Sequence, residues 1–344
     1  MAGANIAVVG ATGAVGQVVL SILEERNFPA GDLKLLASKR SAGNKVSVMG
    51  NEFTVGEATP DSFEGSDIVF FAAGGSISQA LAPEAAKRGA IVVDKSSAWR
   101  MDPIVPLVIP EINPEDIREH EGIISSPNCS TIVMLMALAP LHRANPIKRV
   151  IVDTYQSASG AGAQAVVELL QQTRDILDDK SPSHSTFPAT LAFNAIPHVE
   201  EFAEDDYTTE EIKMENETRK IMHLPDLPVS ATCVRVPVPI SHSEAVHIEF
   251  DNPMSAIEAR DILSEFPGVR VIDGTATKSY PLANFASGKD DVFVGRIRPD
   301  KAFTNGLSIW TVGDNLRKGA ALNAVQIAEA LIEQGLVGSN GNGR

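Results

Sequence analysis

The motif GATGAVG, at residues 10–16, most constrains how this 344-residue chain can fold. It follows the apolar run NIAVV and precedes QVVLSILEE, whose apolar residues recur at helical spacing. Glycines between a strand and a helix let backbone N–H groups approach a pyrophosphate at the positive end of the helix. The spacing is GxxGxxG and not the usual GxGxxG, so a glycine turn in an ordinary βαβ unit is the alternative. The motif predicts a dinucleotide site made of Gly10, Thr12, Gly13, Ala14, Val15 and Gly16.

Apolar segments of strand length alternate with helix-like stretches through the first third of the chain, at residues 6–9, 33–37, 67–72 and 90–93. This alternation predicts a parallel sheet with crossover helices. From about Lys148 the strands become longer and richer in β-branched residues, which indicates a second, mixed domain. Apolar residues at helical spacing predict a final helix over 318–335. The predicted segments are therefore a dinucleotide-binding domain at 1–128, a second domain at 129–314 and a C-terminal segment at 315–344.

The end of the second predicted strand indicates which dinucleotide binds. Enzymes that use NAD place an acidic residue there to hold the ribose hydroxyls. This chain has LKLLASKRSAG, which contains no acid. Lys39, Arg40 and Ser41 instead offer positive charge and a hydroxyl to a 2′-phosphate. The alternative is that Lys39 and Arg40 only lie on an exposed loop. The sequence favours NADP over NAD.

Composition excludes several other classes of protein. The net charge is −15, which disfavours a surface for nucleic acid or an anionic membrane. No apolar run reaches the roughly 18 residues of a membrane span, and the N-terminus lacks the basic region of a signal peptide, so we expect a cytoplasmic protein. Cys129 and Cys233 are the only cysteines, too few for a disulfide framework or a zinc site, and no metal is predicted.

Cys129 is the candidate nucleophile. It lies in SSPNCSTIVMLMALAPL, where a Pro-Asn turn gives way to an apolar pattern of helical spacing. A helix N-terminus stabilises a thiolate, whereas an ordinary cysteine is only about 3% thiolate at pH 7. The position predicts nucleophilic chemistry, with an inert buried cysteine as the alternative. We interpret Cys233 as a packing residue.

Further motifs follow in one order along the chain: GATGAVG, PNCST, YQSASGAG, ETRK and RVPVPISHSEA. In these motifs the chain resembles the aspartate-semialdehyde dehydrogenases, and the resemblance spans nearly its whole length. It implies an α/β protein with an N-terminal Rossmann-type domain, a mixed α+β domain similar to that of glyceraldehyde-3-phosphate dehydrogenase, and a last helix that returns to the first domain. It also implies a homodimer or homotetramer formed through the second domain.

Three other side chains are expected to act with Cys129. His242 lies in a loop-like break, where its unperturbed pKa of about 6.5 suits proton transfer, and the resemblance makes it the general acid-base. Arg235 precedes His242 on the same predicted strand, at an odd separation that sets the two on opposite faces unless the intervening prolines alter the strand. An arginine between valines needs an anion, which the resemblance identifies as the substrate α-carboxylate. Gln156 ends the strand KRVIVDTYQ, where its amide either orients a substrate carbonyl or caps the strand.

Glu217 and Lys220 are three residues apart in ENETRKIM, a spacing that places both on one helical face. An ordinary surface ion pair is the alternative. The resemblance implies that Glu217 meets the substrate amino group, and that phosphate or the acyl phosphate is held by Arg100, Asn128 and Lys220. It also implies nicotinamide contacts for Ser159, Gly160 and Asn315.

The implied reaction is the reversible, NADP-dependent oxidative phosphorylation of L-aspartate 4-semialdehyde to 4-aspartyl phosphate, through a thioester that inorganic phosphate cleaves. It would serve the biosynthesis of lysine, threonine, methionine and diaminopimelate. One alternative is an acyl-phosphate reductase similar to N-acetyl-glutamyl-phosphate reductase, which the PNCST, ETRK and HSEA segments fit less well. The other is a catalytically silent NADP-binding protein, against which Cys129, Gln156 and His242 argue.

Overall fold

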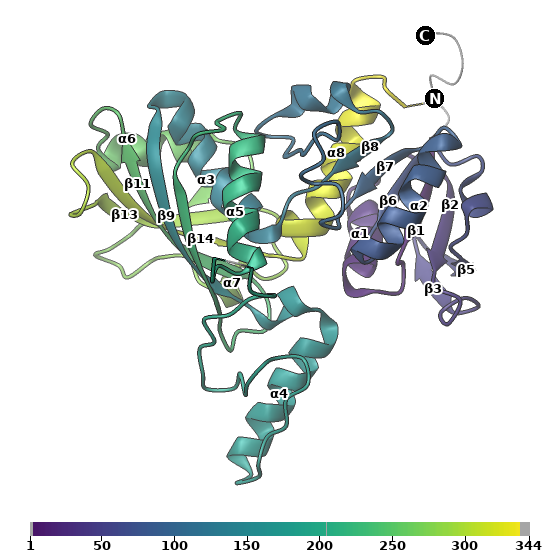
Figure 1. Ribbon diagram of the computed structural model, residues 1–344, viewed down its shortest axis with the longest axis horizontal. Coiled ribbons are helices and arrows are strands. Elements are labelled where there is room, and N and C mark those ends of the chain that lie inside the picture. Colours follow the sequence, from purple (N-terminus) through teal and green to yellow (C-terminus); the bar gives the residue numbers. More distant parts are fainter. Residues whose placement is uncertain (1–2, 204, 338–344) are drawn as a thin grey trace. The chain divides into compact units, whose positions relative to one another are not determined.

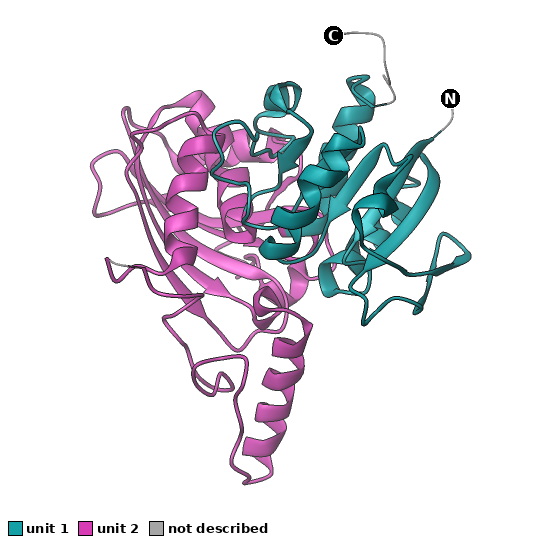
Figure 2. Cartoon of the chain, turned by 45° about the vertical axis from the view of Figure 1, so that its right-hand side comes forward, with its two compact units in different colours: residues 1–127, 320–344 teal, residues 128–319 magenta. Residues whose placement is uncertain are grey.

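The computed structural model describes residues 3–203 and 205–337, and the chain divides into two compact units (Figure 2). Unit 1 comprises residues 1–127 and 320–344, and unit 2 comprises residues 128–319. The second boundary lies later than the predicted 314/315. The reason is that Asn315 and Arg317 hydrogen-bond to Ser241 and Asp290 of unit 2. The end of the predicted C-terminal segment, 338–344, lies outside the described residues.

Unit 1 is built on a parallel sheet with the strand order β5-β2-β1-β6-β7-β8 (Figure 1). The strands are β1 (Ala4–Val9), β2 (Ala30–Ala37), β5 (Gly56–Glu57), β6 (Ile68–Phe71), β7 (Ile91–Asp94) and β8 (Ile123–Ser125). A separate hairpin joins β3 (Lys45–Val48) to β4 (Asn51–Thr54). Because the apolar runs form parallel strands with both faces covered, the predicted Rossmann-type α/β fold is confirmed.

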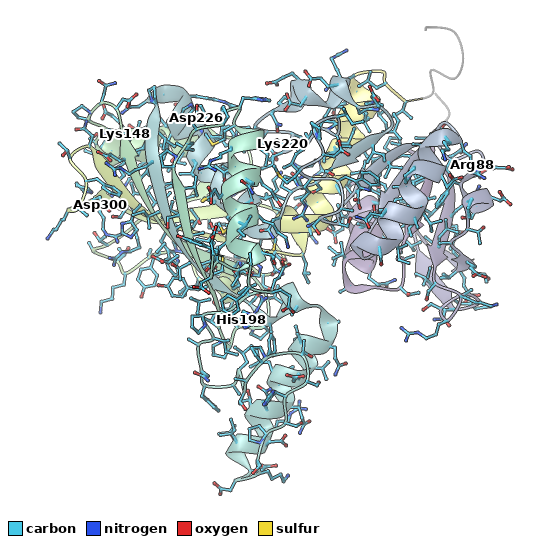
Figure 3. All side chains as sticks on the ribbon, in the orientation of Figure 1. Arg88, Lys148, His198, Lys220, Asp226 and Asp300 are labelled. Carbon is cyan, nitrogen blue, oxygen red and sulfur yellow. The ribbon has the colours of Figure 1, made fainter. Side chains whose placement is uncertain are left out.

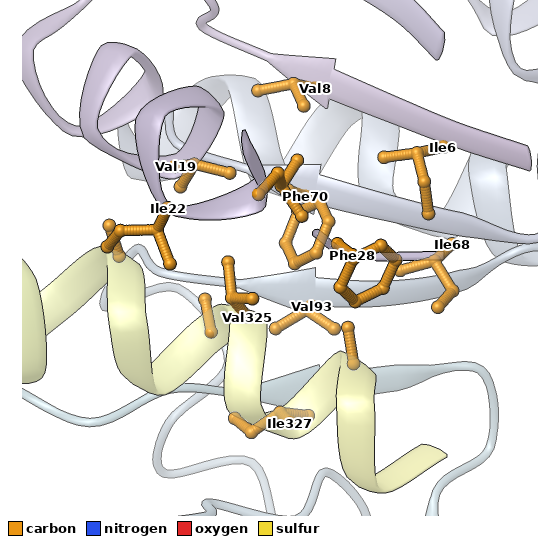
Figure 4. Packing of buried hydrophobic residues seen from close by; sticks show 14 of the residues in the cluster. Ile6, Val8, Val19, Ile22, Phe28, Ile68, Phe70, Val93, Val325 and Ile327 are labelled. Carbon is orange, nitrogen blue, oxygen red and sulfur yellow. The ribbon is translucent and has the colours of Figure 1, made fainter. Parts of the chain in front are cut away.

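The helices of unit 1 are α1 (Ala14–Glu25), α2 (Gly75–Lys87) and α8 (Leu322–Glu333), with 3-10 turns η1 (Pro60–Phe63) and η2 (Pro114–Glu119). The apolar side of α8 is part of the unit 1 core, where Val325 lies beside Phe70 and Val93 (Figure 4). Helix α8, near the C-terminus, therefore packs on the sheet that contains the N-terminal strand β1. A π-helical turn, η4 (Arg317–Ala321), precedes α8.

Unit 2 has a mixed sheet with the strand order β10-β9-β11-β14-β13-β12. Its strands are β9 (Ile147–Gln156), β10 (Val229–Arg235), β11 (His242–Phe250), β12 (Val269–Val271), β13 (Val292–Pro299) and β14 (Gly306–Gly313). Strand β9 runs parallel to β10 and antiparallel to β11. This mixed sheet confirms the predicted α+β second domain.

The helices of unit 2 are α3 (Cys129–Ala144), α4 (Ala163–Leu177), α5 (Thr209–Ile221), α6 (Ala256–Glu265) and α7 (Ala283–Ala286), with a 3-10 turn η3 (Ala158–Ala161). Helix α3 contacts the central strands and both α5 and α6. Every residue of α3 from Ser130 to Leu141 is buried, which explains why the apolar pattern runs around the whole helix. Within residues 3–203 and 205–337, none of the helices has the length and apolar character needed to span a bilayer.

Candidate active site

Three side chains from neighbouring strands of unit 2 lie in one row across the sheet. Arg235 at the end of β10 pairs with Gln156 at the end of β9. Strand β11 begins at His242, and its register with β9, with Ser243 opposite Tyr155, sets His242 on the other side of Gln156. The prediction that Arg235 and His242 share one strand is therefore wrong: they belong to β10 and β11.

The segment 236–241 leaves the sheet because of its prolines. Pro237 and Pro239 have no N–H to donate to a strand ladder. The carbonyl groups of Val238 and Pro239 accept hydrogen bonds from the backbone N–H groups of Ala158 and Ser159, at 2.8 and 3.0 Å. The two prolines thus convert a predicted continuous strand into a connection that holds the loop SASGAG.

Cys129 is the first residue of α3, as the sequence predicts. Asn128 caps this helix, since its Oδ1 accepts from the backbone N–H groups of Ser130 (2.9 Å) and Thr131 (3.3 Å). The Cys129 Sγ lies 3.3 Å from Nε2 of His242. A sulfur at a helix N-terminus and beside an imidazole is stabilised as a thiolate, which is the reactive form.

His242 is completely buried, and its other ring nitrogen faces Ser157. Nδ1 lies 3.0 Å from the backbone nitrogen of Ser157, which donates to it, and 3.1 Å from the Ser157 hydroxyl. The hydroxyl can rotate either to donate a hydrogen bond to Nδ1 or to accept one from Nδ1–H. Ser157 therefore fixes the plane of the imidazole through Nδ1, and Nε2 faces the thiol of Cys129.

The side-chain oxygen of Asn315 ties the loops behind His242 together. Its Oδ1 accepts from the hydroxyl groups of Ser157 (3.2 Å) and Ser159 (3.0 Å) and from the backbone N–H of Ser241 (2.9 Å). These bonds hold the residue before His242 and the loop after Gln156 in one place. The nicotinamide contacts implied for Ser159 and Asn315 stay predictions.

Arg235 is buried with its guanidinium fixed in place. Its Nη1 donates to the backbone oxygen of Ser157 at 2.7 Å. Burial lowers the pKa of the Arg235 guanidinium, and the nearby Glu210 carboxylate acts in the opposite direction. A Cβ atom added at Gly160 would lie 2.7 Å from Arg235 Nη1 and 3.2 Å from His242 Cε1. Glycine at position 160 thus leaves the space that these two side chains occupy.

A cavity of about 510 Å³ opens beside these groups. Its lining includes the thiol of Cys129, the amide of Gln156, the guanidinium of Arg235 and the carboxylate of Glu210. Asn128, Gly160, Ala161 and loop residues 185–188 and 198–201 also line it. A concave site in which a nucleophile lies beside a buried cation suits a small molecule that carries a carboxylate.

Helix α5 carries two of the predicted substrate residues. Glu217 is buried, and its Oε2 accepts from the backbone N–H of Asn128 at 2.6 Å. Lys220 follows on the same helix and is partly exposed (Figure 3). Both hydrogen-bond donors of Asn128 are engaged: its backbone N–H bonds to Glu217, and its side-chain amide bonds to Glu210. The phosphate role of Asn128 and Lys220 and the amino-group role of Glu217 stay predictions.

Glu210 is a site residue that the sequence analysis missed. It is buried in the first turn of α5, lines the cavity, and accepts hydrogen bonds from the side chains of Asn128 and Gln156. One signal was present in the sequence: Glu210 precedes Glu217 by seven residues, or two helical turns, so both acids lie on one face of α5. Ser157 was likewise overlooked, although it belongs to the quoted motif YQSASGAG.

Cys233 lies in the same strand as Arg235, away from the cavity lining. Its Sγ is 3.7 Å from Sδ of Met214 on α5. Burial raises the pKa of the Cys233 thiol, and the Glu210 carboxylate raises it further. A buried thiol that resists ionisation is consistent with packing and not with chemistry.

The glycine turn of unit 1 has the geometry of a phosphate cradle. Gly10 has a φ of 83°, and a Cβ atom at Gly16 would lie 2.1 Å from the carbonyl oxygen of Gly10. Gly13 is the N-cap of α1, and no side chain caps this helix end. The backbone N–H groups at the start of α1 are thereby left open to an anion. The turn holds the predicted residues Gly10, Thr12, Gly13, Ala14, Val15 and Gly16.

The other predicted binding residues of unit 1 are Arg40 and Ser41, for the 2′-phosphate of NADP, and Arg100, for phosphate. Arg40 is exposed and Ser41 partly exposed in the turn after β2, where the backbone N–H of Ser41 donates to the carbonyl of Ser38. Arg100 is buried and donates to the backbone oxygens of Ser126 (3.1 Å) and Lys95 (2.9 Å). The guanidinium of Arg100 is therefore held in one orientation.

Two domain models match the chain. The semialdehyde dehydrogenase NAD binding domain matches residues 5–120, and the semialdehyde dehydrogenase dimerisation domain matches residues 138–318. The chain is 54% identical to the aspartate-semialdehyde dehydrogenase of Bacillus subtilis over 343 residues, which covers 97% of this chain and 99% of the relative. It is 53% identical to that of Aquifex aeolicus, covering 97% of this chain and all of the relative.

A solved structure with a closely similar fold is aspartate semialdehyde dehydrogenase II of Vibrio cholerae complexed with ASA. It is 44% identical, with a TM-score of 0.94, and the match covers 96% of this chain and 98% of that one. The comparisons confirm the resemblance found in the motifs and do not favour the acyl-phosphate reductase alternative. The chain belongs to the aspartate-semialdehyde dehydrogenase family, whose members are NADP-dependent phosphorylating dehydrogenases.

Proposed function

We propose that this chain oxidises L-aspartate 4-semialdehyde to 4-aspartyl phosphate, reversibly, through a thioester on Cys129. The observation that carries the proposal is the contact between Cys129 Sγ and His242 Nε2 at 3.3 Å, beside a cavity that Arg235 also lines. A nucleophile, a proton-transfer group and a fixed cation are the parts that covalent chemistry on a small carboxylate needs.

Arg235 binds the α-carboxylate of the substrate in this account. Its guanidinium is buried and anchored through Nη1 to Ser157, which leaves the planar fork oriented toward the cavity that it lines. A charge-assisted pair in such a place is stronger than one in water. The bound carboxylate holds the aldehyde carbon within reach of Cys129.

The oxidation begins when Cys129 Sγ attacks the aldehyde carbon. His242 Nε2 takes the thiol proton and delivers it to the aldehyde oxygen, which gives a hemithioacetal. Nε2 then removes that hydroxyl proton as the carbon loses its hydride, and the carbon–oxygen double bond re-forms as a thioester. Bound NADP supplies the acceptor for the hydride.

Phosphorolysis releases the product. A phosphate oxygen attacks the thioester carbon, the carbon–sulfur bond breaks, and Cys129 leaves as a thiolate at the N-terminus of α3. Arg100 and Lys220 supply the positive charge that holds phosphate. Asn128 contributes only if one of its present bonds to Glu210 or Glu217 is exchanged.

The residues of unit 1 fit NADP. A Cβ atom at Gly16 would clash with the backbone of Gly10, so glycine at position 16 permits the tight turn whose N–H groups suit a pyrophosphate. Arg40 and Ser41 stand where an enzyme specific for NAD has an acid. Ser159, Gly160 and Asn315 of unit 2 are proposed neighbours of the nicotinamide.

A homodimer formed through unit 2 is the proposed assembly. The face of the sheet opposite α3 carries Tyr155 and Trp310, whose ring centroids are 5.3 Å apart, and Tyr155 is 39% exposed. These rings line an open groove of about 730 Å³. The match of residues 138–318 to a dimerisation domain supports this assembly. We further propose a cytoplasmic enzyme that reduces the acyl phosphate in the biosynthesis of lysine, threonine, methionine and diaminopimelate.

The direct test is NADPH formation from aspartate semialdehyde, followed at 340 nm. Sustained turnover is expected with NADP and phosphate together, a sharp loss when phosphate is omitted, and much slower turnover with NAD. N-acetyl-glutamate semialdehyde serves as the competing substrate. Faster turnover of that compound, or turnover independent of phosphate, would overturn the proposal.

A further inference from the structure

We infer that Glu210 is a positioning residue that fixes the side-chain amides of Asn128 and Gln156, so that Gln156 presents its acceptor oxygen to the substrate. The inference rests on the proposed function, because it concerns how the same cavity receives the aldehyde. It starts from a carboxylate that the proposed reaction itself does not use.

Glu210 is 3% exposed and makes three hydrogen bonds to two amides. Nδ2 of Asn128 donates to both carboxylate oxygens, at 3.0 and 2.9 Å, and Nε2 of Gln156 donates to Oε1 at 3.0 Å. The nearest cation is Lys213, whose Nζ lies 3.6 Å from Oε2. An ionised carboxylate only accepts hydrogen bonds, so both amides must turn their nitrogen atoms toward it.

The two hydrogens of Gln156 Nε2 are both used. One bond goes to Glu210 Oε1 at 3.0 Å, and the other goes to the hydroxyl oxygen of Ser130 at 2.8 Å. Gln156 therefore has no amide hydrogen left for a carbonyl oxygen of the substrate. What it offers to the cavity is Oε1, an acceptor.

The same carboxylate secures the start of α3. Asn128 uses Oδ1 to cap the helix and Nδ2 to bind Glu210, so neither atom is interchangeable. Reversing this amide would set an N–H₂ group against the backbone N–H groups of Ser130 and Thr131. Glu210 thus orients the residue that immediately precedes Cys129.

An acceptor beside Cys129 and Arg235 selects a donor on the substrate. The hydroxyl of the hemithioacetal and the α-ammonium group both carry hydrogens that Gln156 Oε1 can accept. The carbonyl oxygen of the aldehyde carries no hydrogen and therefore cannot donate to Gln156 Oε1. This assigns Gln156 a different partner from the carbonyl that the sequence suggested.

The test compares Glu210→Gln, Glu210→Asp and Glu215→Gln in the full-length enzyme. Glu210→Gln keeps the shape of the side chain but replaces one carboxylate oxygen by an N–H₂ group. If its oxygen takes the place of Oε1, which accepts from both amides, the N–H₂ group faces Asn128 Nδ2 in place of Oε2, so two donors meet and the amide of Asn128 must shift. Glu210→Asp keeps a carboxylate on a shorter side chain. Glu215→Gln is the matched control, because it removes one charge from the surface of the same helix, where Glu215 pairs with Arg219.

Glu210→Gln is expected to lower kcat/KM for aspartate semialdehyde by roughly 10- to 100-fold while the KM for NADP stays unchanged. Glu210→Asp should keep more activity than Glu210→Gln, and Glu215→Gln should match the wild type. Thermal unfolding of each variant separates lost activity from lost fold. A Glu210→Gln enzyme that is folded and as active as the wild type would overturn the inference, as would an Asp variant weaker than the Gln variant. The proposed function is tested separately in the same series by phosphate-dependent turnover of the wild type.

Discussion

Arg235 and His242 flank Gln156 in a single row across three neighbouring strands, although a sequence count along one strand would set them on opposite faces. The row forms because β10 and β11 both pair with β9, one parallel and one antiparallel. The proposed substrate anchor, Arg235, and the proposed proton-transfer group, His242, thus lie on either side of the Gln156 amide. The thiol of Cys129 reaches the row from α3 through its contact with His242.

Replacing Gly160 by alanine should disable the site through space alone. The new Cβ atom would lie 2.7 Å from Arg235 Nη1 and 3.3 Å from His242 Nε2, so one of these side chains must move. Since a displacement of about 1 Å costs on the order of 10²-fold in rate, kcat/KM for the aldehyde should fall by that order. Steady-state kinetics with a thermal unfolding control give the answer. A Gly160→Ala enzyme with wild-type kinetics would show that the packing argument is mistaken.

Arg235→Lys should behave as a loss of substrate binding and not as a conservative change. Lysine cannot reproduce the planar fork that bonds to Ser157 and a carboxylate together. Loss of one charge-assisted hydrogen bond should weaken substrate binding by about 10- to 100-fold. We expect this loss mainly as a raised KM for aspartate semialdehyde. Arg270→Lys, at a largely exposed ion pair with Asp291, is the control that should leave KM unchanged. An unaltered KM in Arg235→Lys would assign the carboxylate to another residue.

Arg40→Ala should weaken the preference for NADP. The arginine is exposed in the turn after β2, where its charge is available to a 2′-phosphate. We expect kcat/KM to fall roughly 10-fold with NADP and to change little with NAD. Lys45→Ala is the matched control, because it also removes one positive charge, from an exposed ion pair with Glu52 on the neighbouring hairpin. Equal effects on NADP and NAD would argue against a role in recognising the phosphate.

The parallel sheet of unit 1 and the helix start at Cys129 were predictable because they depend on local signals. Strand-length apolar runs, turn glycines and a Pro-Asn cap are short patterns with a direct structural meaning. The row of Arg235, Gln156 and His242 was not predictable in this way. It depends on which strands pair and on two prolines that interrupt a β-branched run, and strand pairing is a non-local property.

The residues that the sequence analysis missed share one property. Glu210 and Ser157 act by holding other side chains, so their types say little about chemistry when they are considered alone. An acid in the first turn of a helix is ordinary, because it complements the helix dipole. Only the burial of Glu210 against two amides distinguishes it from Glu211, which completes a capping box with Thr208.

A pH effect on stability should arise from Glu244. This residue is completely buried on β11, and burial raises the pKa of its carboxyl well above the ordinary 4.5 although Thr311 donates a hydrogen bond to it. The folded state therefore keeps Glu244 neutral while the unfolded chain ionises it above pH 4.5, so its contribution to stability is lost as pH rises toward the folded pKa.

Glu244→Gln removes this titration. The free energy of unfolding of the variant, relative to the wild type, should increase in denaturant titrations as pH rises from about 4.5 toward the folded pKa of Glu244. Glu249→Gln, at an ion pair with Arg149 whose bond lowers the pKa of Glu249 against the effect of burial, should not show this gain. A difference between Glu244→Gln and the wild type that does not vary with pH would mean that Glu244 is ionised in the folded protein.

The thioester itself is measured most directly by mass spectrometry of the intact enzyme and of its Cys129 peptide, after mixing with aspartate semialdehyde and NADP in the absence of phosphate. We predict one aspartyl group per chain on Cys129, formed with a single burst of NADPH and lost when phosphate is added, and no adduct in Cys129→Ala. Phosphate-dependent NADPH formation by Cys129→Ala at the wild-type rate, or an acyl group on another residue, would contradict the account.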